Sequence, residues 1–532
     1  MQKYSFLKND MQYIKKNFVQ NISIRIWNEG RKGYIPCSVA RNNYNIYLMN
    51  TEKHNSFRHA LKYTSIFGGV QGLNVLIGLI RNKFVAVILG PAGMGLVSLY
   101  NSTSSLMSNL TGLGLSMSGV RRVSEDYDEN PDSEKLLDTV KLIRSLSVVA
   151  AIFGTLICML FSGVLSYFTF GDCSHVYSFM ALSPLIGMMA IITGELAVMK
   201  GVRMLRPLAL ATLFNVVAAL FISVPLFYCY GMKGIIPSFL LVSFSQILFT
   251  MHYSCRRFPF RISFRREFLS RGNTIIKLGV AFVLAGVFSS GSEFLIRLFL
   301  NNLGSLDTVG LYNAGYMITI VYGGLVFSAM ETDFFPRLSA VGNDDKVGQN
   351  SVVNRQVEVS LVLISPMLIA FIIALPVILP LLFSSKFNAV LTMTQVTVLA
   401  LYMRALKLPL SYMALAKGDS KSFLFLEGVY AVVVFVLVSV MYWLFGFVGT
   451  GWALLLTAVL DFIMLTLYTK HKYGYTMSHD VFKIAVMQLP LGGLAFVLSQ
   501  SLYGLSYWVA GIAVTLISAA VSYMTLRRKK NI

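Results

Sequence analysis

Long apolar runs separated by short polar segments make up most of the chain after residue 60. Each run is about 20 residues or longer, which is the length that an α-helix needs to cross the hydrocarbon core of a bilayer. The pattern predicts an all-α polytopic membrane protein with about fourteen transmembrane helices, twelve at the minimum, because the last two runs are the weakest. The predicted spans are 64–89, 93–120, 145–169, 177–199, 207–229, 235–253, 275–300, 308–332, 358–383, 389–416, 422–446, 448–469, 482–501 and 504–526.

Lysine and arginine gather in alternate loops between these runs. Positive residues accumulate in the cytoplasmic loops of membrane proteins. Basic clusters fall here in every second loop, beginning around Arg121 and Arg122, whereas the other loops hold only Lys233 and Lys386. A missed or invented helix would break this alternation, so the charges support the count of fourteen independently of hydropathy. They also predict that both termini are cytoplasmic.

The same order of helices predicts five segments. The first is a polar cytoplasmic extension, and within it two interpretations of residues 1–48 stand: a true extension, or a misassigned start, since Met49 opens a stretch typical of an ordinary N-terminus. Two six-helix lobes follow, joined by a basic linker, and then two further helices with a basic tail. The predicted bounds are 1–59 for the extension, 60–253 for the N-lobe, 254–273 for the linker, 274–470 for the C-lobe and 471–532 for the last helices.

Two stretches of the chain resemble one another. LIRNKFVAVILGPAGMGLVSLYN (79–101) and LIRLFLNNLGSLDTVGLYN (295–313) share Leu-Ile-Arg, Leu-Gly, Gly-Leu and Tyr-Asn in the same order. Six predicted helices separate the copies, so the repeat is parallel, with its axis along the membrane normal. This predicts two pseudo-symmetric lobes around a central cavity, although chance matching in apolar sequence is the alternative.

Composition removes several classes of function. Hydrophobic residues form 55% of the chain and charged residues 13%, whereas soluble domains carry about 25% charge. The net charge of +21 follows from the basic loops, and we expect no nucleic-acid partner. The five cysteines form no CxxC pair, although a bridge between Cys173 and Cys229 is an alternative to free thiols. No GxxxxGK[ST] phosphate loop occurs, and we expect no metal and no cofactor.

Several ionisable residues fall inside the predicted spans, where a charge costs several kcal/mol. Arg404 and Lys407 are three residues apart and share one helix face. Glu293 and Arg297 are four apart, so they are either a site or a self-neutralised structural pair. Of Arg81 and Lys83, two apart, the repeat favours Arg81 as the interior residue. Acidic residues at similar depth are Glu293, Glu427 and Asp461, with Glu195, Glu331 and Asp333 nearer the inner surface.

The basic residues suggest an anionic substrate. Arginine binds phosphate through two parallel hydrogen bonds, whereas an exporter of cations would concentrate carboxylates. We therefore interpret Arg81, Arg297, Arg404 and Lys407 as substrate-binding residues of the cavity, with Glu293 and Asp461 as candidates for ion coupling. No residue has a catalytic role in this interpretation.

Four motifs give the chain a family resemblance. AVILGPAGMGLVSLYN (86–101), FFPRLSAV (334–341), LPLLFSSKFNAV (379–390) and YMALAKGDSKSFLFLE (412–427) occur in order and at the expected topological positions. Over residues 60–430 the chain resembles the Wzx-type O-antigen and oligosaccharide flippases. These form the polysaccharide transporter family of the multidrug/oligosaccharidyl-lipid/polysaccharide (MOP) superfamily.

The resemblance implies a transporter and not an enzyme. A flippase of this kind moves an undecaprenyl-diphosphate-linked oligosaccharide across the bacterial inner membrane by alternating access. The implied partners are that lipid-linked oligosaccharide, the membrane lipids and, as further candidates, the polysaccharide polymerase and chain-length proteins. Three alternatives remain: a MATE-type multidrug exporter, a lipid II flippase, which also has fourteen helices, and a membrane-bound polymerase or glycosyltransferase. The short outer loops leave little room for the last.

Overall fold

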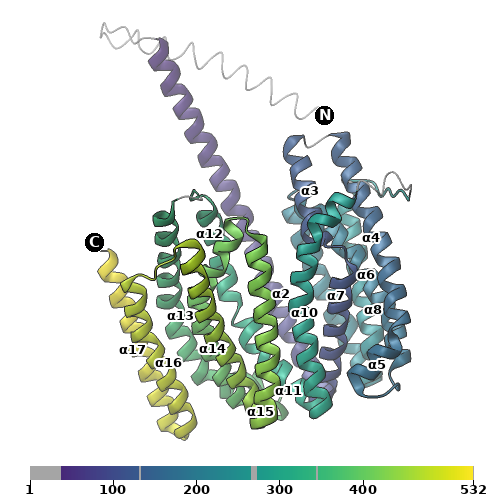
Figure 1. The fold of residues 1–532 in the computed structure, drawn as a ribbon, viewed down its shortest axis with the longest axis vertical. Coiled ribbons are helices and arrows are strands. Elements are labelled where there is room, and N and C mark those ends of the chain that lie inside the picture. The colour runs from purple at the N-terminus through teal and green to yellow at the C-terminus, as the bar shows by residue number, and fades with distance from the viewer. Residues whose placement is uncertain (1–36, 131–132, 265–271, 343–344, 531–532) are drawn as a thin grey trace. The chain divides into compact units, whose positions relative to one another are not determined.

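The computed structural model describes residues 37–130, 133–264, 272–342 and 345–530, and all regular structure in these ranges is helical (Figure 1). The chain forms two compact units, Met1–Ile66 and Phe67–Ile532, and the second contains every helix pair discussed below. Its first half contains α2 (Cys37–Thr111, which begins in the first unit), α3 (Leu115–Glu129), α4 (Glu134–Leu160), α5 (Ser162–Phe170), α6 (Val176–Gly201), α7 (Leu205–Tyr230), η1 (Gly231–Gly234) and α8 (Ile235–Cys255).

The second half continues with longer helices. They are α10 (Asn273–Leu303), α11 (Leu306–Tyr316), the π-helical η2 (Met317–Tyr322), α12 (Leu325–Ser339), α13 (Lys346–Leu382), η3 (Ser385–Val390), α14 (Leu391–Ala416), α15 (Ser420–Tyr473), α16 (His479–Ser501) and α17 (Gly504–Lys530).

The long helix α15 is a hairpin. At Gly446 the backbone leaves the helix with φ 62° and ψ −149°, a conformation that glycine adopts without steric cost. The two ends of α15 meet, because Lys472 Nζ lies 2.6 Å from Asp419 Oδ2 and the Tyr468 hydroxyl donates to Ser422 Oγ at 2.7 Å. The sequence therefore predicted the turn between the eleventh and twelfth spans correctly.

A similar break divides α2. Gly90 has φ 66° and ψ −170°. Beyond it, Ser98 Oγ donates to Asn313 Oδ1 at 2.9 Å, so the second arm runs parallel to α11. Before it, Asn82 Nδ2 donates to the Tyr322 hydroxyl at 2.6 Å, so the first arm runs antiparallel to the same segment. The two arms of α2 are therefore two separate membrane passes.

Eleven helical stretches of the described chain are long and apolar enough to cross a membrane. Three of them hold two passes each: the stretch with Gly90, the stretch Leu205–Cys255, which η1 divides, and the stretch with Gly446. This gives fourteen passes and confirms the predicted fold class, including the two weakest helices, which form α16 and α17 and pack against α13. The cytoplasmic placement of the termini and the exact segment bounds stay predictions. The question of whether residues 1–48 are a true extension also stays open, because residues 1–36 lie outside the described residues.

Packing divides the helices into two groups. In the first, α4 packs on α6, and α6 and α7 both pack on α8; in the second, α14 packs on α13 and α15, and α10 packs on α15 (Figure 1). The largest cluster of buried apolar side chains belongs mainly to the second group, from Ile296 to Ala485, whereas smaller clusters lie among α3, α4, α6 and α8. Helix α10 also packs against α3 and α5 and so joins the two groups; the division into an N-lobe and a C-lobe stays a prediction.

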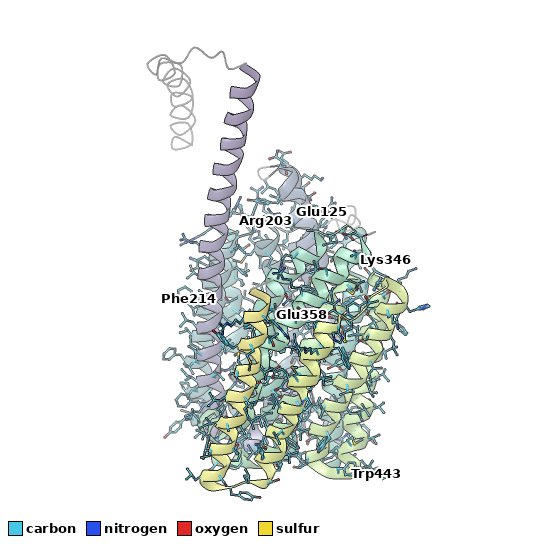
Figure 2. The ribbon with its side chains drawn as sticks, turned by 90° about the vertical axis from the view of Figure 1, so that its left-hand side faces the viewer. Glu125, Arg203, Phe214, Lys346, Glu358 and Trp443 are labelled. Atoms are coloured by element: carbon cyan, nitrogen blue, oxygen red, sulfur yellow. The ribbon has the colours of Figure 1, made fainter. Side chains whose placement is uncertain are left out.

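The outer surface of the helices carries many large apolar side chains. Figure 2 shows Glu125, Arg203 and Lys346 toward one end of the helices and Trp443 at the other. Many large apolar side chains are exposed on the outside, including Leu160 at 80% and Trp443 at 72%. Such a surface is unfavourable in water and fits hydrocarbon, with tryptophan at the interface.

The two repeats meet at a pair of glycines. A Cβ added to Gly95 would lie 3.0 Å from the amide nitrogen of Gly310 and closer still to the Leu306 carbonyl oxygen; a Cβ added to Gly310 would lie 2.9 Å from the amide nitrogen of Gly95 and closer still to the Pro91 carbonyl oxygen. Both glycines occupy the Gly-Leu position of the predicted repeat. The reciprocal contact agrees with the predicted two-fold relation between the lobes.

We expect Gly310→Ala to destabilise the protein. The added methyl group would meet main-chain atoms of α2 that cannot rotate away, and overpacking of this kind costs about 1–3 kcal/mol. The matched control is Gly78→Ala, a helical glycine whose added Cβ would meet no atom within 4 Å. Thermal unfolding of the purified proteins should show a lower midpoint for Gly310→Ala only; equal midpoints would contradict the close contact.

Candidate functional site

One cavity gathers most of the ionisable residues inside the helices. Its volume is about 320 Å³, and α10, α11, η2, α14 and both arms of α15 line it. Its lining includes three basic residues and three acidic ones: Arg297, Arg404, Lys407, Glu293, Glu427 and Asp461. Of the four predicted substrate-binding cations, three therefore line the same cavity.

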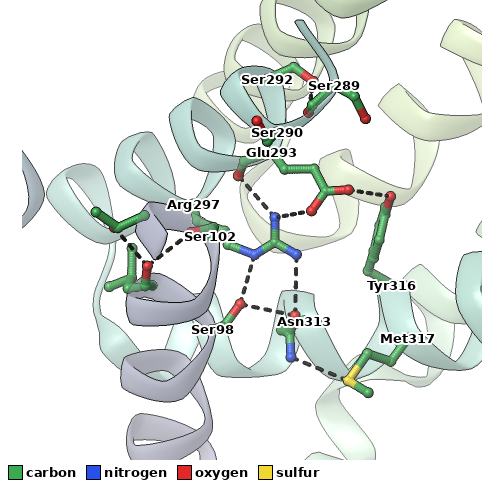
Figure 3. A network of polar contacts seen from close by, with 12 residues as sticks. Ser98, Ser102, Ser289, Ser290, Ser292, Glu293, Arg297, Asn313, Tyr316 and Met317 are labelled. Atoms are coloured by element: carbon green, nitrogen blue, oxygen red, sulfur yellow. Dashed lines mark hydrogen bonds and ion pairs between the residues drawn. The ribbon is translucent and has the colours of Figure 1, made fainter. Parts of the chain in front are cut away.

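Arg297 is only 6% exposed, and its guanidinium, which has five N–H donors, makes four hydrogen bonds (Figure 3). Its Nη1 donates to the Glu293 carboxylate at 3.2 Å and to the Glu293 carbonyl oxygen at 3.0 Å. Its Nε donates to Ser98 Oγ at 2.7 Å, and its Nη2 to Asn313 Oδ1 at 3.4 Å. The predicted pair with Glu293 is confirmed, and the same side chain also joins the two lobes, because Ser98 belongs to α2.

Lys407 forms the second pair of the cavity. Its ammonium group contacts the Asp461 carboxylate on the second arm of α15 and lies 4.7 Å from the ring centroid of Tyr430 on the first arm. The pair thus neutralises Lys407 and holds α14 against both arms of α15. Such a contact was invisible in the sequence because 54 residues separate the partners.

Arg404 is the least constrained cation of the cavity. Its Nη1 donates to the Ile320 carbonyl oxygen at 3.3 Å, and its guanidinium carbon lies 5.3 Å from the ring centroid of Phe327. A Cβ on Gly324 would come within 2.9 Å of Nη1, so the absence of a side chain there makes room for the guanidinium. No carboxylate within the described chain pairs with Arg404.

Arg81 does not line this cavity. It lies on the first arm of α2, one residue before Asn82, which bonds Tyr322. The Nε atom of Arg81 is buried without a hydrogen-bond partner, whereas Lys83 is exposed. The prediction that Arg81 is the more interior of the two is confirmed, but the structure does not bring Arg81 together with Arg297, Arg404 and Lys407.

The charge balance of the cavity differs from the sequence-based expectation. Four candidate cations suggested a site for an anionic substrate, yet the described lining has three carboxylates for three cations. The reason is local pairing, since an unpaired charge in a poorly hydrated site is costly. The side chains of Glu331 and Asp333 lie outside the described part of the chain.

A further ion pair lies outside the cavity. Arg144 of α4, 2% exposed, binds both carboxylate oxygens of Glu195 of α6, at 2.7 and 3.1 Å. Its Nη1 donates to the carbonyl oxygens of Phe258 and Pro259 at 3.1 and 2.8 Å. The pair fixes the first part of the predicted linker on the N-lobe. Arg144 did not stand out in the sequence, because it lies next to the basic residues that precede the predicted span 145–169.

The sequence reasoning also missed Ser98 and Asn313. Serine and asparagine inside a span carry no distinctive signal, and the two residues lie 215 positions apart. The described residues contain no group of three or more histidine, cysteine or acidic side chains able to hold a metal ion. Of the two alternatives for Cys173 and Cys229, a bridge or free thiols, the structure shows free thiols.

A family model of polysaccharide biosynthesis proteins matches residues 60–341, which is more than half of the chain. The chain belongs to the polysaccharide biosynthesis protein family. A search of curated protein sequences gave no significant match.

Several solved structures of transporters have a similar fold. An inward-facing multidrug resistance MATE family transporter of the MOP superfamily is 16% identical, with a TM-score of 0.64 over 75% of this chain and 94% of that one. The lipid II flippase MurJ in an inward closed conformation is 14% identical, with a TM-score of 0.65 over 88% of this chain and 99% of that one. A MOP superfamily transporter from Pyrococcus furiosus is 14% identical, with a TM-score of 0.52 over 77% and 93%. At these identities the likeness establishes the fold.

We expect Arg297→Gln to lower stability far more than Arg404→Gln. The first change removes four hydrogen bonds of the guanidinium, including the link to Ser98. Glu293 is left without its cation but is 42% exposed and stays partly solvated, so the loss is set mainly by these bonds, each worth about 1.5–3 kcal/mol when a charged group is involved. The second removes one such hydrogen bond, of 3.3 Å. Chemical or thermal unfolding in detergent measures both, and equal losses would show that Arg297 is not the structural member of the pair.

Proposed function

We propose that this protein is a flippase that moves an undecaprenyl-diphosphate-linked oligosaccharide from the inner to the outer leaflet of a bacterial inner membrane. The family assignment connects the chain with polysaccharide biosynthesis, and the fold is that of MOP superfamily transporters. The substrate joins a hydrocarbon chain to sugars through a diphosphate. A protein that carries it must therefore offer a cationic group at membrane depth.

The proposal rests mainly on the position and the contacts of Arg404. It lines the cavity, its guanidinium makes a single hydrogen bond, and no described carboxylate neutralises it. Its remaining N–H groups suit the bidentate recognition of phosphate oxygens. Arg297 and Lys407 contribute positive charge nearby, but each is already held by a carboxylate. Arg81 stands apart from this cavity, so its proposed role as a substrate cation depends on the conformation reached during transport.

Alternating access requires the lobes to separate on one side and meet on the other. The contacts between Gly95 and Gly310 and between Ser98 and Asn313 join the lobes next to the turn at Gly90, which the charge pattern places on the outer side. This arrangement fits a state that is closed toward the outside. Transport is movement of an intact molecule, so we propose no covalent step, catalytic residue or cofactor.

A lipid II flippase is the second candidate. Fourteen passes and a match over 99% of the MurJ chain favour it. Its substrate has the same diphosphate chemistry, so the cavity does not separate the two. Deletion of the gene would separate them: loss of a lipid II flippase stops growth, whereas loss of an oligosaccharide flippase removes a surface polysaccharide.

A multidrug exporter is less well supported, because two of the three cavity carboxylates are neutralised by cations. Glycosyltransferase genes beside this one, and the polymerase and chain-length proteins as partners, would favour the oligosaccharide.

We expect Arg404→Ala to abolish transport without loss of the membrane protein, because the diphosphate loses its unpaired cation. Surface polysaccharide in a complemented deletion strain, together with accumulation of the lipid-linked precursor, measures the effect. The control is Lys83→Ala, which removes a basic residue that is exposed on α2 and outside the cavity lining. Normal surface polysaccharide in the Arg404 variant would refute the assignment.

A further inference from the structure

Two ionisable residues of the cavity lining have no ion-pair partner among the described residues. Arg297 is held by Glu293 at 3.2 Å, and Lys407 contacts Asp461. The remaining cation is Arg404 and the remaining carboxylate is Glu427, and both line the same cavity. Glu427 makes no hydrogen bond or ion pair with any residue that the structure describes. The site thus contains one uncommitted cation and one uncommitted carboxylate.

Glu427 lines the cavity from the first arm of α15. It lies one turn before Tyr430 on the first arm of α15, so the two residues share a helix face, and Tyr430 lies against Lys407. The groups that surround the cavity are Arg404 and Lys407 on α14, Asp461 on the second arm of α15, Glu293 and Arg297 on α10, and Tyr312 and Tyr316 on α11.

The other two carboxylates are poor proton acceptors by comparison. Glu293 accepts from Arg297 and, at 3.4 Å, from the Tyr316 hydroxyl, and Asp461 accepts from Lys407. Protonating either one would break an ion pair and leave a buried cation uncompensated. Protonating Glu427 breaks no contact with a described residue. It also removes the one carboxylate charge of this cavity that hydrogen bonds do not stabilise.

We propose that Glu427 is the proton-accepting group of this site and takes up a proton from solution when an anionic substrate binds at Arg404. With all six groups ionised the charges of the cavity cancel, and one proton on Glu427 leaves a net charge of +1. An anion then binds more tightly to the protonated site, and by linkage the bound anion favours proton uptake. The inference rests on the proposed function and replaces Glu293 and Asp461 with Glu427 as the ion-coupling residue.

The test measures binding rather than transport. The probe is a short-chain prenyl diphosphate linked to N-acetylglucosamine, titrated into purified full-length protein between about pH 5.5 and pH 8, where a diphosphate diester keeps a constant charge while a carboxyl group in a protein can titrate. Wild-type protein should bind about tenfold more tightly at the lower pH. Titrations in buffers of different ionisation enthalpy should show net proton uptake by the protein.

Glu427→Gln is the decisive variant. Its affinity should equal the low-pH affinity of wild type at every pH, and its proton uptake should disappear. The matched control is Glu293→Gln, which keeps Glu427 and should keep the pH dependence whatever its absolute affinity. Persistent pH dependence in Glu427→Gln, or a wild-type affinity that does not change with pH, would overturn the inference; the second measurement stands even if the variant fails to fold.

The same titrations separate this inference from the proposed function. Binding that is lost in Arg404→Ala, with no effect of Glu427 on pH dependence, refutes the proton-accepting role alone. Absence of binding in wild-type protein at any pH, or full affinity in Arg404→Ala, refutes the diphosphate site and the inference with it.

Discussion

The cost of an uncompensated charge among apolar helices determines most of the polar contacts in this protein. Water is scarce in such an environment, so an ionised side chain must find its compensation within the protein. Arg144 does so with Glu195 and Arg297 with Glu293, and Lys407 with Asp461. Each pair also joins separate helices or lies at a junction between them. Charge compensation therefore adds a polar contact to the apolar interfaces of α4 with α6 and of α14 with α15.

The same constraint explains how function is separated from structure inside one cavity. A cation most of whose donors are occupied is part of the scaffold, and releasing it for a ligand would break several hydrogen bonds at once. Arg297 with its four bonds is such a residue, whereas Arg404 has one. Depth in the membrane alone does not distinguish the two arginines. The number of N–H donors without a partner distinguishes them, and it favours Arg404 for the proposed binding of an anion.

The sequence predicted what depends on local pattern. Apolar runs predicted the fourteen passes, and two boundaries between predicted spans lie at or next to the breaks at Gly90 and Gly446. Spacing placed Arg404 with Lys407 and Glu293 with Arg297 on common faces. Compensation by distant residues could not be predicted in this way. Asp461 lies 54 residues from Lys407, and Ser98 lies 199 from Arg297. The interpretation of the cavity as cationic considered the depth of each residue in the membrane. It could not include the contact with Asp461, which neutralises Lys407 from another helix.

The asymmetry between the lobes follows from these contacts. The repeat gives both lobes similar helix pairs, and their glycines Gly95 and Gly310 meet at the junction. The ionisable lining of the described cavity nevertheless comes entirely from residues 289–465, in the second lobe. A symmetric scaffold with a one-sided charge cluster can hold an anion against one lobe while the other moves, since the attraction need not be broken when the lobes separate. The link from Arg297 to Ser98 is the exception, because it crosses between the lobes. Under the proposed alternating-access mechanism, opening next to Gly90 would break that bond, so Arg297 would link charge compensation to lobe movement.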